Sequence, residues 1–153
     1  FGGKQGAVDF YGNIAKAAED SGLKVNFDKI DRTPNTLDAH RVIHWSGLEG
    51  KQTRFVTALF KAFFVEGHDI SKHDVLVDVA KSVGIDGEMI RKLLDQDVDK
   101  DGIRKRDKYA CEKGVSGVPC FIVQDHYVVQ GAQPPEMWAK VIDEIAAQID
   151  AVE

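Results

Sequence analysis

The chain has 153 residues, of which 43% are hydrophobic and 29% are charged, and its formal net charge is −5 at pH 7. This is the composition of an ordinary globular protein, and it excludes an intrinsically disordered or collagen-like chain. The 20 Lys and Arg residues are outnumbered by 25 Asp and Glu residues, which argues against a phosphate-binding surface and hence against a nucleic-acid partner.

Hydrophobic periodicity predicts a largely helical chain before the C-terminal part. A first helix is predicted over residues 8–18 and ends near Gly22, and a weak strand signal follows at residues 25–28. Asn35 or Thr36 is the expected cap of the next helix, and Ser71 with Asp74 resembles a capping box. Apolar residues at helical spacing predict five helices here: residues 35–47, 51–66, 71–83, around 90–94, and 104–113.

The C-terminal part changes character and predicts a β-hairpin followed by one helix. Residues 120–123 and 127–129 are rich in β-forming side chains and flank a turn at Asp125 and His126. Pro134 and Pro135 open the last helix, whose apolar residues recur at helical spacing. These apolar residues are Trp138, Val141, Ile142, Ile145 and Ile149. Two or three strands do not form a stable sheet on their own. We therefore expect one or two more strands on the N-terminal side.

Three general features indicate where such a chain works. It has no apolar run of about 18 residues, so no membrane-spanning helix or membrane partner is expected. It begins with Phe1 and no leader is visible, so we expect that it was cut at its start. Its two cysteines, Cys111 and Cys120, are too few for a disulfide framework and predict a reducing, cytoplasmic location.

Two groups of residues resemble metal sites without completing one. Asp97, Asp99 and Asp101 match the first half of an EF-hand loop, but Lys108 stands where the bidentate Glu is needed. A solvated acidic helix end is therefore favoured over calcium binding. The paired histidines, His40 with His44 and His68 with His73, lack a third ligand, and we predict no metal site.

Four segments, taken together, point to one family. GVSGVPCFIV at residues 114–123 resembles the cis-proline loop of thioredoxin-fold proteins. QGAQPPE at residues 130–136 resembles the strand-to-helix turn of the DsbA-like family, in its FrnE-type branch. PNTLDAHR at residues 34–41 and FKAFFVEGHDI at residues 60–70 are similar to the helical insert of that branch.

This resemblance implies an α/β, thioredoxin-like fold with an α-helical insertion, incomplete at its N-terminal side. Residues 1–34 would hold the end of the first thioredoxin-fold half and the connection, and residues 35–113 the helical insertion. Residues 114–153 would form the C-terminal half, with the cis-proline loop, the hairpin and the last helix.

The resemblance also implies a redox-active protein dithiol–disulfide oxidoreductase acting on protein or peptide disulfides. The redox Cys-x-x-Cys of the family begins a helix, where the dipole stabilises a thiolate, and no such motif occurs in the 153 residues. We therefore identify no catalytic residue in this chain and expect it to be inactive alone. A cis peptide bond before Pro119 is expected to turn the Val118 backbone outward, toward an extended peptide or glutathione.

Cys120 stands where the family more usually has an apolar or hydroxyl residue. We favour a small buried hydrophobe, with an auxiliary redox thiol as the alternative. A disulfide between Cys111 and Cys120 has no support from the sequence. Trp45 and Trp138 are predicted core anchors, although Trp45 would also suit a pocket under the insert.

Two other functions stay open. Glutathione-dependent isomerases and transferases, of the hydroxychromene-carboxylate isomerase and kappa classes, share the inserted-helix architecture, and glutathione would then be the single cofactor. A Ser in place of the first redox Cys would favour them. The third candidate is a redox-silent module that binds extended peptides. Unpaired strands would favour a homodimer in any of these cases.

Overall fold

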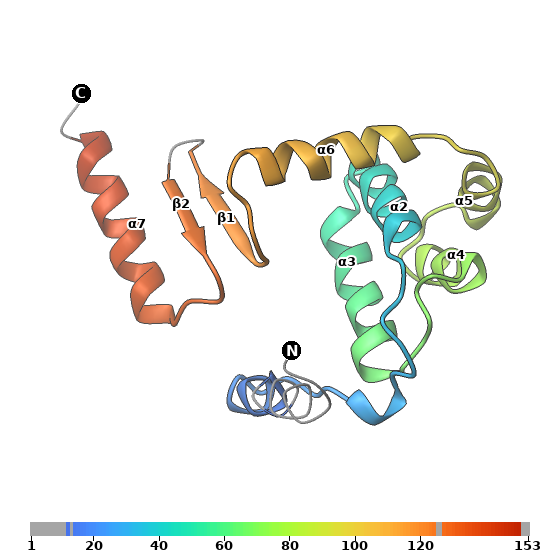
Figure 1. The fold of residues 1–153 in the computed structure, drawn as a ribbon, viewed down its shortest axis with the longest axis horizontal. Helices are drawn as coiled ribbons and strands as arrows, with labels where there is room; N and C mark the ends of the chain where they lie inside the picture. Colours follow the sequence, from blue (N-terminus) through green and yellow to red (C-terminus); the bar gives the residue numbers. More distant parts are fainter. Residues whose placement is uncertain (1–11, 13, 125–126, 151–153) are drawn as a thin grey trace. The chain divides into compact units, whose positions relative to one another are not determined.

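The computed structural model describes residue 12, residues 14–124 and residues 127–150, and it contains two compact units, Phe1–Lys105 and Arg106–Glu153 (Figure 1). The described residues are mostly helical. Their one sheet has two strands and lies in the second unit. Within the described residues, no helix is both long enough and apolar enough to cross a membrane.

The first unit is built from short helices. Residues 14–20 form a helix that ends at Gly22, whose φ of 71° is the left-handed backbone that favours glycine. Two short helical segments and five α-helices follow, and the α-helices keep the expected order, with some shifted ends. They are η1 (Phe27–Lys29), α2 (Leu37–Leu48), α3 (Gln52–Phe60), η2 (Lys61–Val65), α4 (His73–Ser82), α5 (Gly87–Leu94) and α6 (Lys100–Glu112), the last of which crosses into the second unit.

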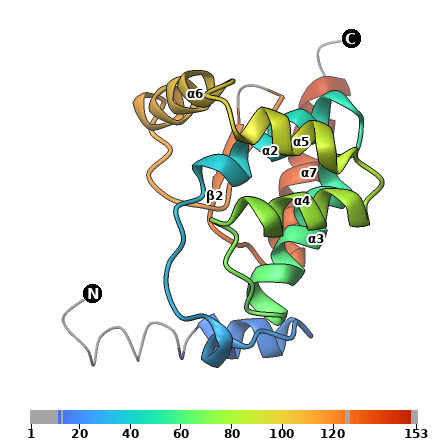
Figure 2. The same cartoon turned by 90° about the vertical axis from the view of Figure 1, so that its right-hand side faces the viewer.

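The core of this unit lies among α2, α3, α4 and α5, which pack together as Figures 1 and 2 show. The apolar stripes predicted for these helices supply it, and Trp45 is 6% exposed, which confirms it as a core anchor. Removing one such side chain from water stabilises the fold by about 1.5–3 kcal/mol. Large apolar members of the core include Trp45, Phe55, Leu59, Ile70, Leu76, Ile85, Ile90 and Leu94.

Two local predictions are wrong. Residues 25–28 form no strand, because the Asn26 backbone N–H donates to the Phe64 carbonyl at 2.7 Å and Phe27 begins the 3-10 turn η1. The capping box at Ser71 is also absent. Helix α4 begins at His73, and Ser71 donates its backbone N–H and its hydroxyl to Asp69 Oδ1 instead. The residues 8–11 of the first predicted helix lie outside the described residues.

The helix predicted over residues 51–66 ends in an unusual way. Its last part, η2, is a π-helical turn, with the Glu66 N–H bonded to the Lys61 carbonyl at 3.1 Å. The carbonyls of Phe64 and Val65 at its end are satisfied by Asn26, through the backbone N–H and through Nδ2 at 2.6 Å. The end of η2 is thus bonded to a segment about forty residues earlier in the chain.

The second unit is a hairpin with one helix. Strands β1 (Cys120–Val123) and β2 (Tyr127–Gln130) pair antiparallel, and α7 (Pro135–Asp150) follows. The Phe121 and Trp138 rings meet edge to face with centroids 4.7 Å apart, and Ile145 is buried. Trp138 is half-buried rather than fully enclosed, and Ile142 is exposed. The predicted turn residues Asp125 and His126 lie outside the described residues.

Candidate functional site

The loop that enters the hairpin begins where α6 ends. Gly114 has a φ of 88°, and the Val115 N–H bonds back to the Ala110 carbonyl at 3.1 Å, which closes the helix. The loop then reaches Pro119, and the Val118–Pro119 peptide bond is cis, as the sequence predicts. The Pro119 carbonyl accepts the Gly131 N–H at 2.8 Å, which fixes the loop to the far end of β2.

Val118 is the most exposed large apolar residue of the described chain, with 89% of its surface accessible. Its backbone N–H and C=O make no hydrogen bond to other described residues. Within the described part of the chain, both groups thus keep their capacity to bond to another chain. The neighbouring carbonyl of Pro119, by contrast, is already engaged.

The two faces of the hairpin differ. Side chains alternate along a strand, so Phe121 and its register partner Val129 share one face while Ile122 and Val128 share the other. The first face lies against α7 through the Phe121–Trp138 contact. The second face is open, with Ile122 56% and Val128 57% exposed.

Cys120 lies on the open face, opposite Gln130 in the strand register. Cys120 is half-buried, so the prediction that it is a small buried hydrophobic residue is only partly confirmed. Cys111 is exposed on α6, and both thiols are free in the structure. Nothing here assigns a redox role to either sulfur.

The sequence of β1 indicates that one face of the hairpin is open, although hydrophobic periodicity alone does not. The β1 sequence Cys-Phe-Ile-Val is apolar at every position, which is typical of a strand covered on both faces. The predicted hairpin and helix account for one covered face only. A fully apolar strand for which only one covering helix is predicted therefore indicates that the second face of its sheet is open.

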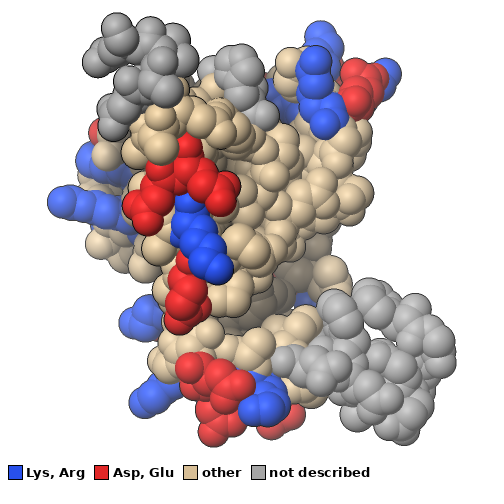
Figure 3. Space-filling model, turned by 90° about the vertical axis from the view of Figure 1, so that its left-hand side faces the viewer, with Lys and Arg blue, Asp and Glu red and all other residues tan. Residues whose placement is uncertain are grey.

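Helix α7 turns its charged side to solvent. Its exposed residues include Glu136, Lys140, Asp143 and Glu144. Figure 3 shows acidic and basic side chains in one stripe, flanked by uncharged surface. Because both signs alternate in this stripe, it forms no single-sign patch.

The aspartates that resemble a calcium loop are already paired. A hydrogen bond from Lys100 at 2.6 Å lowers the pKa of Asp97, and Asp99 accepts from the Trp45 indole at 2.8 Å. Asp101 pairs with Arg104 at 3.2 Å. The residues that the structure describes include no group of three or more His, Cys, Asp or Glu able to hold a metal ion.

The predicted insert signature at residues 34–41 serves the packing of the first unit. Asn35 Oδ1 accepts the Leu37 N–H at 3.0 Å, while Thr36 makes no side-chain cap bond. His40 contacts the Thr36 carbonyl at 2.7 Å. Burial alone would raise the pKa of Asp38, but hydrogen bonds from Arg41 and His73 outweigh it and lower that pKa. The structural role of Arg41 was not predicted.

Comparison with known proteins gives the family. A model of the DSBA-like thioredoxin domain matches residues 8–143. The uncharacterized protein YwbO of Bacillus subtilis is 31% identical over 133 residues, covering 86% of this chain and 66% of that protein.

Two solved structures share the fold. A probable DsbA oxidoreductase from Streptomyces coelicolor is 26% identical, with a TM-score of 0.81 over 92% of this chain and 60% of that one. A candidate protein disulfide isomerase from Nitrosomonas europaea is 21% identical, with a TM-score of 0.80 over 95% of this chain and 76% of that one. The chain thus spans less than two thirds of the first two relatives, and it belongs to the DSBA-like thioredoxin domain family.

Proposed function

We propose that this chain forms the substrate-facing wall of a DsbA-like, FrnE-type thiol–disulfide oxidoreductase. The wall consists of Val118 and Pro119, with residues 35–113 as the helical insertion and residues 114–153 as the C-terminal thioredoxin-fold half. The observation that carries the proposal is the exposed Val118, whose backbone donor and acceptor have no bond within the described part of the chain. The family match supports the reaction class.

The chemistry of disulfide exchange defines what this chain contributes. A thiolate attacks one sulfur of a substrate disulfide, a mixed disulfide forms, and a second thiol resolves it. The 153 residues contain no Cys-x-x-Cys, so this chain supplies binding rather than electrons. An extended substrate would add to the Val118 backbone as a strand, with main-chain hydrogen bonds giving affinity.

Peptide binding tests the wall directly. We expect a short extended peptide containing a disulfide to shift the amide resonance of Val118 and its neighbours in a two-dimensional nitrogen–proton NMR spectrum. The matched control is the same peptide methylated on its backbone nitrogens, which cannot donate to Val118. Equal shifts with both peptides, or shifts that spare residues 114–120, would contradict the proposal.

The reaction class needs a separate assay. Insulin reduction by the longest natural protein that contains these residues is expected to be fast, while the 153-residue chain alone is expected to be inactive. A redox-silent module that binds extended peptides is the second candidate, because the exposed Val118 backbone would serve it equally well. Peptide binding without insulin reduction by the natural protein would support that second candidate.

A further inference from the structure

A cavity lies in the first unit, between the strap (residues 26–36) and the helical end formed by Phe60 and η2. Its volume is about 710 Å³, and a smaller hollow of about 310 Å³ adjoins it, sharing Ile30, Asp31, Arg32 and Phe63 as lining. Ligand pockets in proteins commonly have about 300–1,000 Å³. The space is thus sufficient for a small organic molecule.

The larger cavity has an aromatic wall. Phe27 comes from η1, Phe60 ends α3, and Phe63 and Phe64 belong to η2. The Phe63 and Phe64 rings meet edge to face at 4.8 Å, and the Phe60 and Phe64 rings do so at 5.9 Å. Phe60 is 57% exposed, so part of this wall faces open space.

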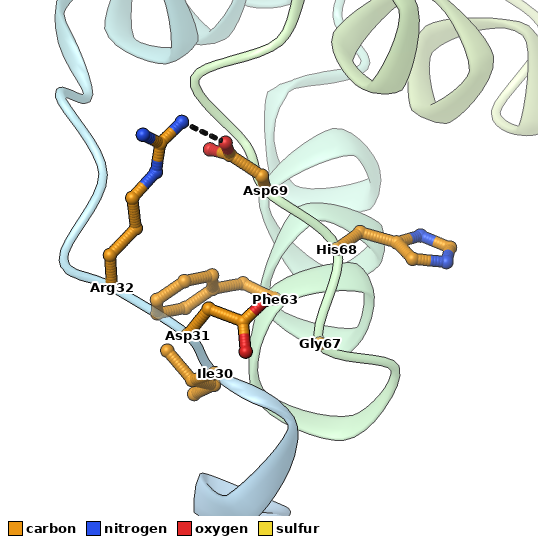
Figure 4. Close-up of a pocket in the computed structure, with 7 residues that line it drawn as sticks. All are labelled: Ile30, Asp31, Arg32, Phe63, Gly67, His68 and Asp69. Carbon is orange, nitrogen blue, oxygen red and sulfur yellow. Dashed lines mark hydrogen bonds and ion pairs between the residues drawn. The ribbon is translucent and has the colours of Figure 1, made fainter.

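The strap is held in place by specific contacts. Asn26 bonds to the carbonyls of Phe64 and Val65. Gly67 passes so close to Lys29 that a Cβ at this position would stand 2.5 Å from the Lys29 Cβ. At the other end of the cavity, Arg32 Nη2 donates to Asp69 Oδ2 at 2.6 Å, the dashed contact of Figure 4. These contacts hold both ends of the strap against η2 and the residues that follow it.

The charges around the cavity are not balanced. Hydrogen bonds from Ser71 and Arg32 lower the pKa of Asp69 to about 2, so the Arg32 cation is matched by a permanent anion. Asp31 is exposed and lines both hollows without a hydrogen bond or ion pair within the described residues, although its charge joins that of Asp69 in raising the pKa of Arg32. Figure 4 shows Asp31 beside the Phe63 ring, while the His68 side chain points away from the other labelled residues. Among the Lys, Arg, Asp and Glu residues that line the two hollows, there are two carboxylates, Asp31 and Asp69, and one guanidinium, Arg32.

We propose that this cavity binds an organic cation, a primary amine carried on an aromatic group. The faces of phenylalanine rings attract cations, and the Asp31 carboxylate provides the opposite charge. An anionic ligand would meet the excess negative charge, and a neutral ligand would leave Asp31 unpaired. The site involves none of the residues proposed to bind a substrate peptide.

Three phenyl compounds of similar size and different charge test the charge preference. The probes are phenethylamine, 2-phenylethanol and 3-phenylpropionate, titrated into the 153-residue chain and followed by nitrogen–proton NMR. We expect the amine to bind about fivefold more tightly than the alcohol, or better, and the acid to bind most weakly. The shifted amides are expected within residues 26–36 and 60–70. An amine that binds no better than the alcohol would overturn the proposal.

Two substitutions assign the preference to named groups. Asp31→Asn removes the charge but keeps the shape, and it is expected to abolish the difference between amine and alcohol. Its matched control is Asp28→Asn, an exposed aspartate of the neighbouring short helix η1 that does not line the cavity. Phe60→Leu is expected to weaken the binding of the amine more than the binding of the alcohol. An unchanged amine preference in Asp31→Asn, or an equal loss in Asp28→Asn, would refute the assignment. Failure here would leave the role of Val118 intact, because the two sites share no residue.

Discussion

The guanidinium of Arg41 lies with Nη1 2.7 Å from Asp38 Oδ1, and none of the Arg41 side chain is exposed. The same group donates to the carbonyls of Leu93 at 2.6 Å, Gln96 at 2.5 Å and Val98 at 2.7 Å. These carbonyls lie at and beyond the end of α5, where the helix itself leaves acceptors unsatisfied. Arg41 therefore joins α2 to the turn that follows α5.

Removing Arg41 should be costly. Arg41→Met would leave several part-buried carbonyls without a donor and Asp38 with His73 alone, and loss of one partner of a buried pair costs about 3–5 kcal/mol. We expect a loss of this size in the free energy of unfolding, measured with urea. Arg104→Met serves as the control, because Arg104 is exposed and pairs only with Asp101 on the same helix. Similar losses in both variants would argue against the network.

At Gly67, the destabilisation caused by a clash with Lys29 can be measured separately from that caused by the left-handed backbone. Gly67→Ala adds a Cβ that meets Lys29 at 2.5 Å, at a φ of 76°. Gly50→Ala is the matched control, because its φ is 68° and nothing lies within 4 Å of the added Cβ. We expect Gly50→Ala to cost about 1–2 kcal/mol from the left-handed backbone alone. Gly67→Ala should cost clearly more in urea unfolding, and equal losses would exclude a steric role for Lys29.

Acid should weaken the attachment of the strap within a defined range. The folded state holds the pKa of Asp69 at about 2, below the ordinary value of 3.8, through Ser71 and Arg32. A lowered pKa stabilises the fold above the ordinary value, and this stabilisation is lost as the pH falls from about 4 to about 2. We expect Asp69→Asn to be less stable than wild type at pH 7 and to match it near pH 2.

The control for this titration is Asp78→Asn, an exposed residue of α4 whose nearest cation, Lys81, is 3.9 Å away. Its stability difference from wild type should stay small at every pH. Urea unfolding at pH 7, 4 and 2.5 measures both variants. A constant difference between Asp69→Asn and wild type across this range would contradict the linkage.

The two thiols should react at different rates. Cys111 is exposed and Cys120 is half-buried, and both are free. With Ellman's reagent under native conditions, we expect a fast phase and a slow phase, each of one thiol. Cys111→Ser should remove the fast phase and Cys120→Ser the slow one. A native protein with no titratable thiol would show that the two cysteines are bonded to each other.

Much of the helical part was predictable, because the signals are local. The apolar spacing of residues 75–80 is enough to predict α4, and Asp86 caps α5 through bonds to the next residues, Glu88 and Met89. The start of α6 was predicted four residues late, because Lys100–Glu112 buries no side chain and so carries no apolar stripe. The cis bond at Pro119 followed from family resemblance rather than from any local preference.

The features that the sequence did not reveal depend on distant partners. Arg41 donates hydrogen bonds to backbone carbonyls more than fifty residues away. Every residue carries such a carbonyl, so the side chains of the sequence do not indicate which carbonyls Arg41 will meet. Asn26 ends η2 by bonds to residues 38 and 39 positions later in the chain, although periodicity predicted a strand at Asn26. The cavity beneath the strap depends on two such long-range contacts, that of Asn26 with η2 and that of Arg32 with Asp69. A single sequence gives no measure of these distances.

The π-helical turn η2 sets the direction in which the chain continues. Each residue of an α-helix advances the chain by about 100° around the axis. One residue added to an α-helix would turn everything after it by about that angle, unless a wider turn absorbs it, and the bond from Glu66 to Lys61 closes such a wider turn. The extra residue is thus taken up locally within Lys61–Val65. Gly67 and Asp69 keep their places opposite Lys29 and Arg32.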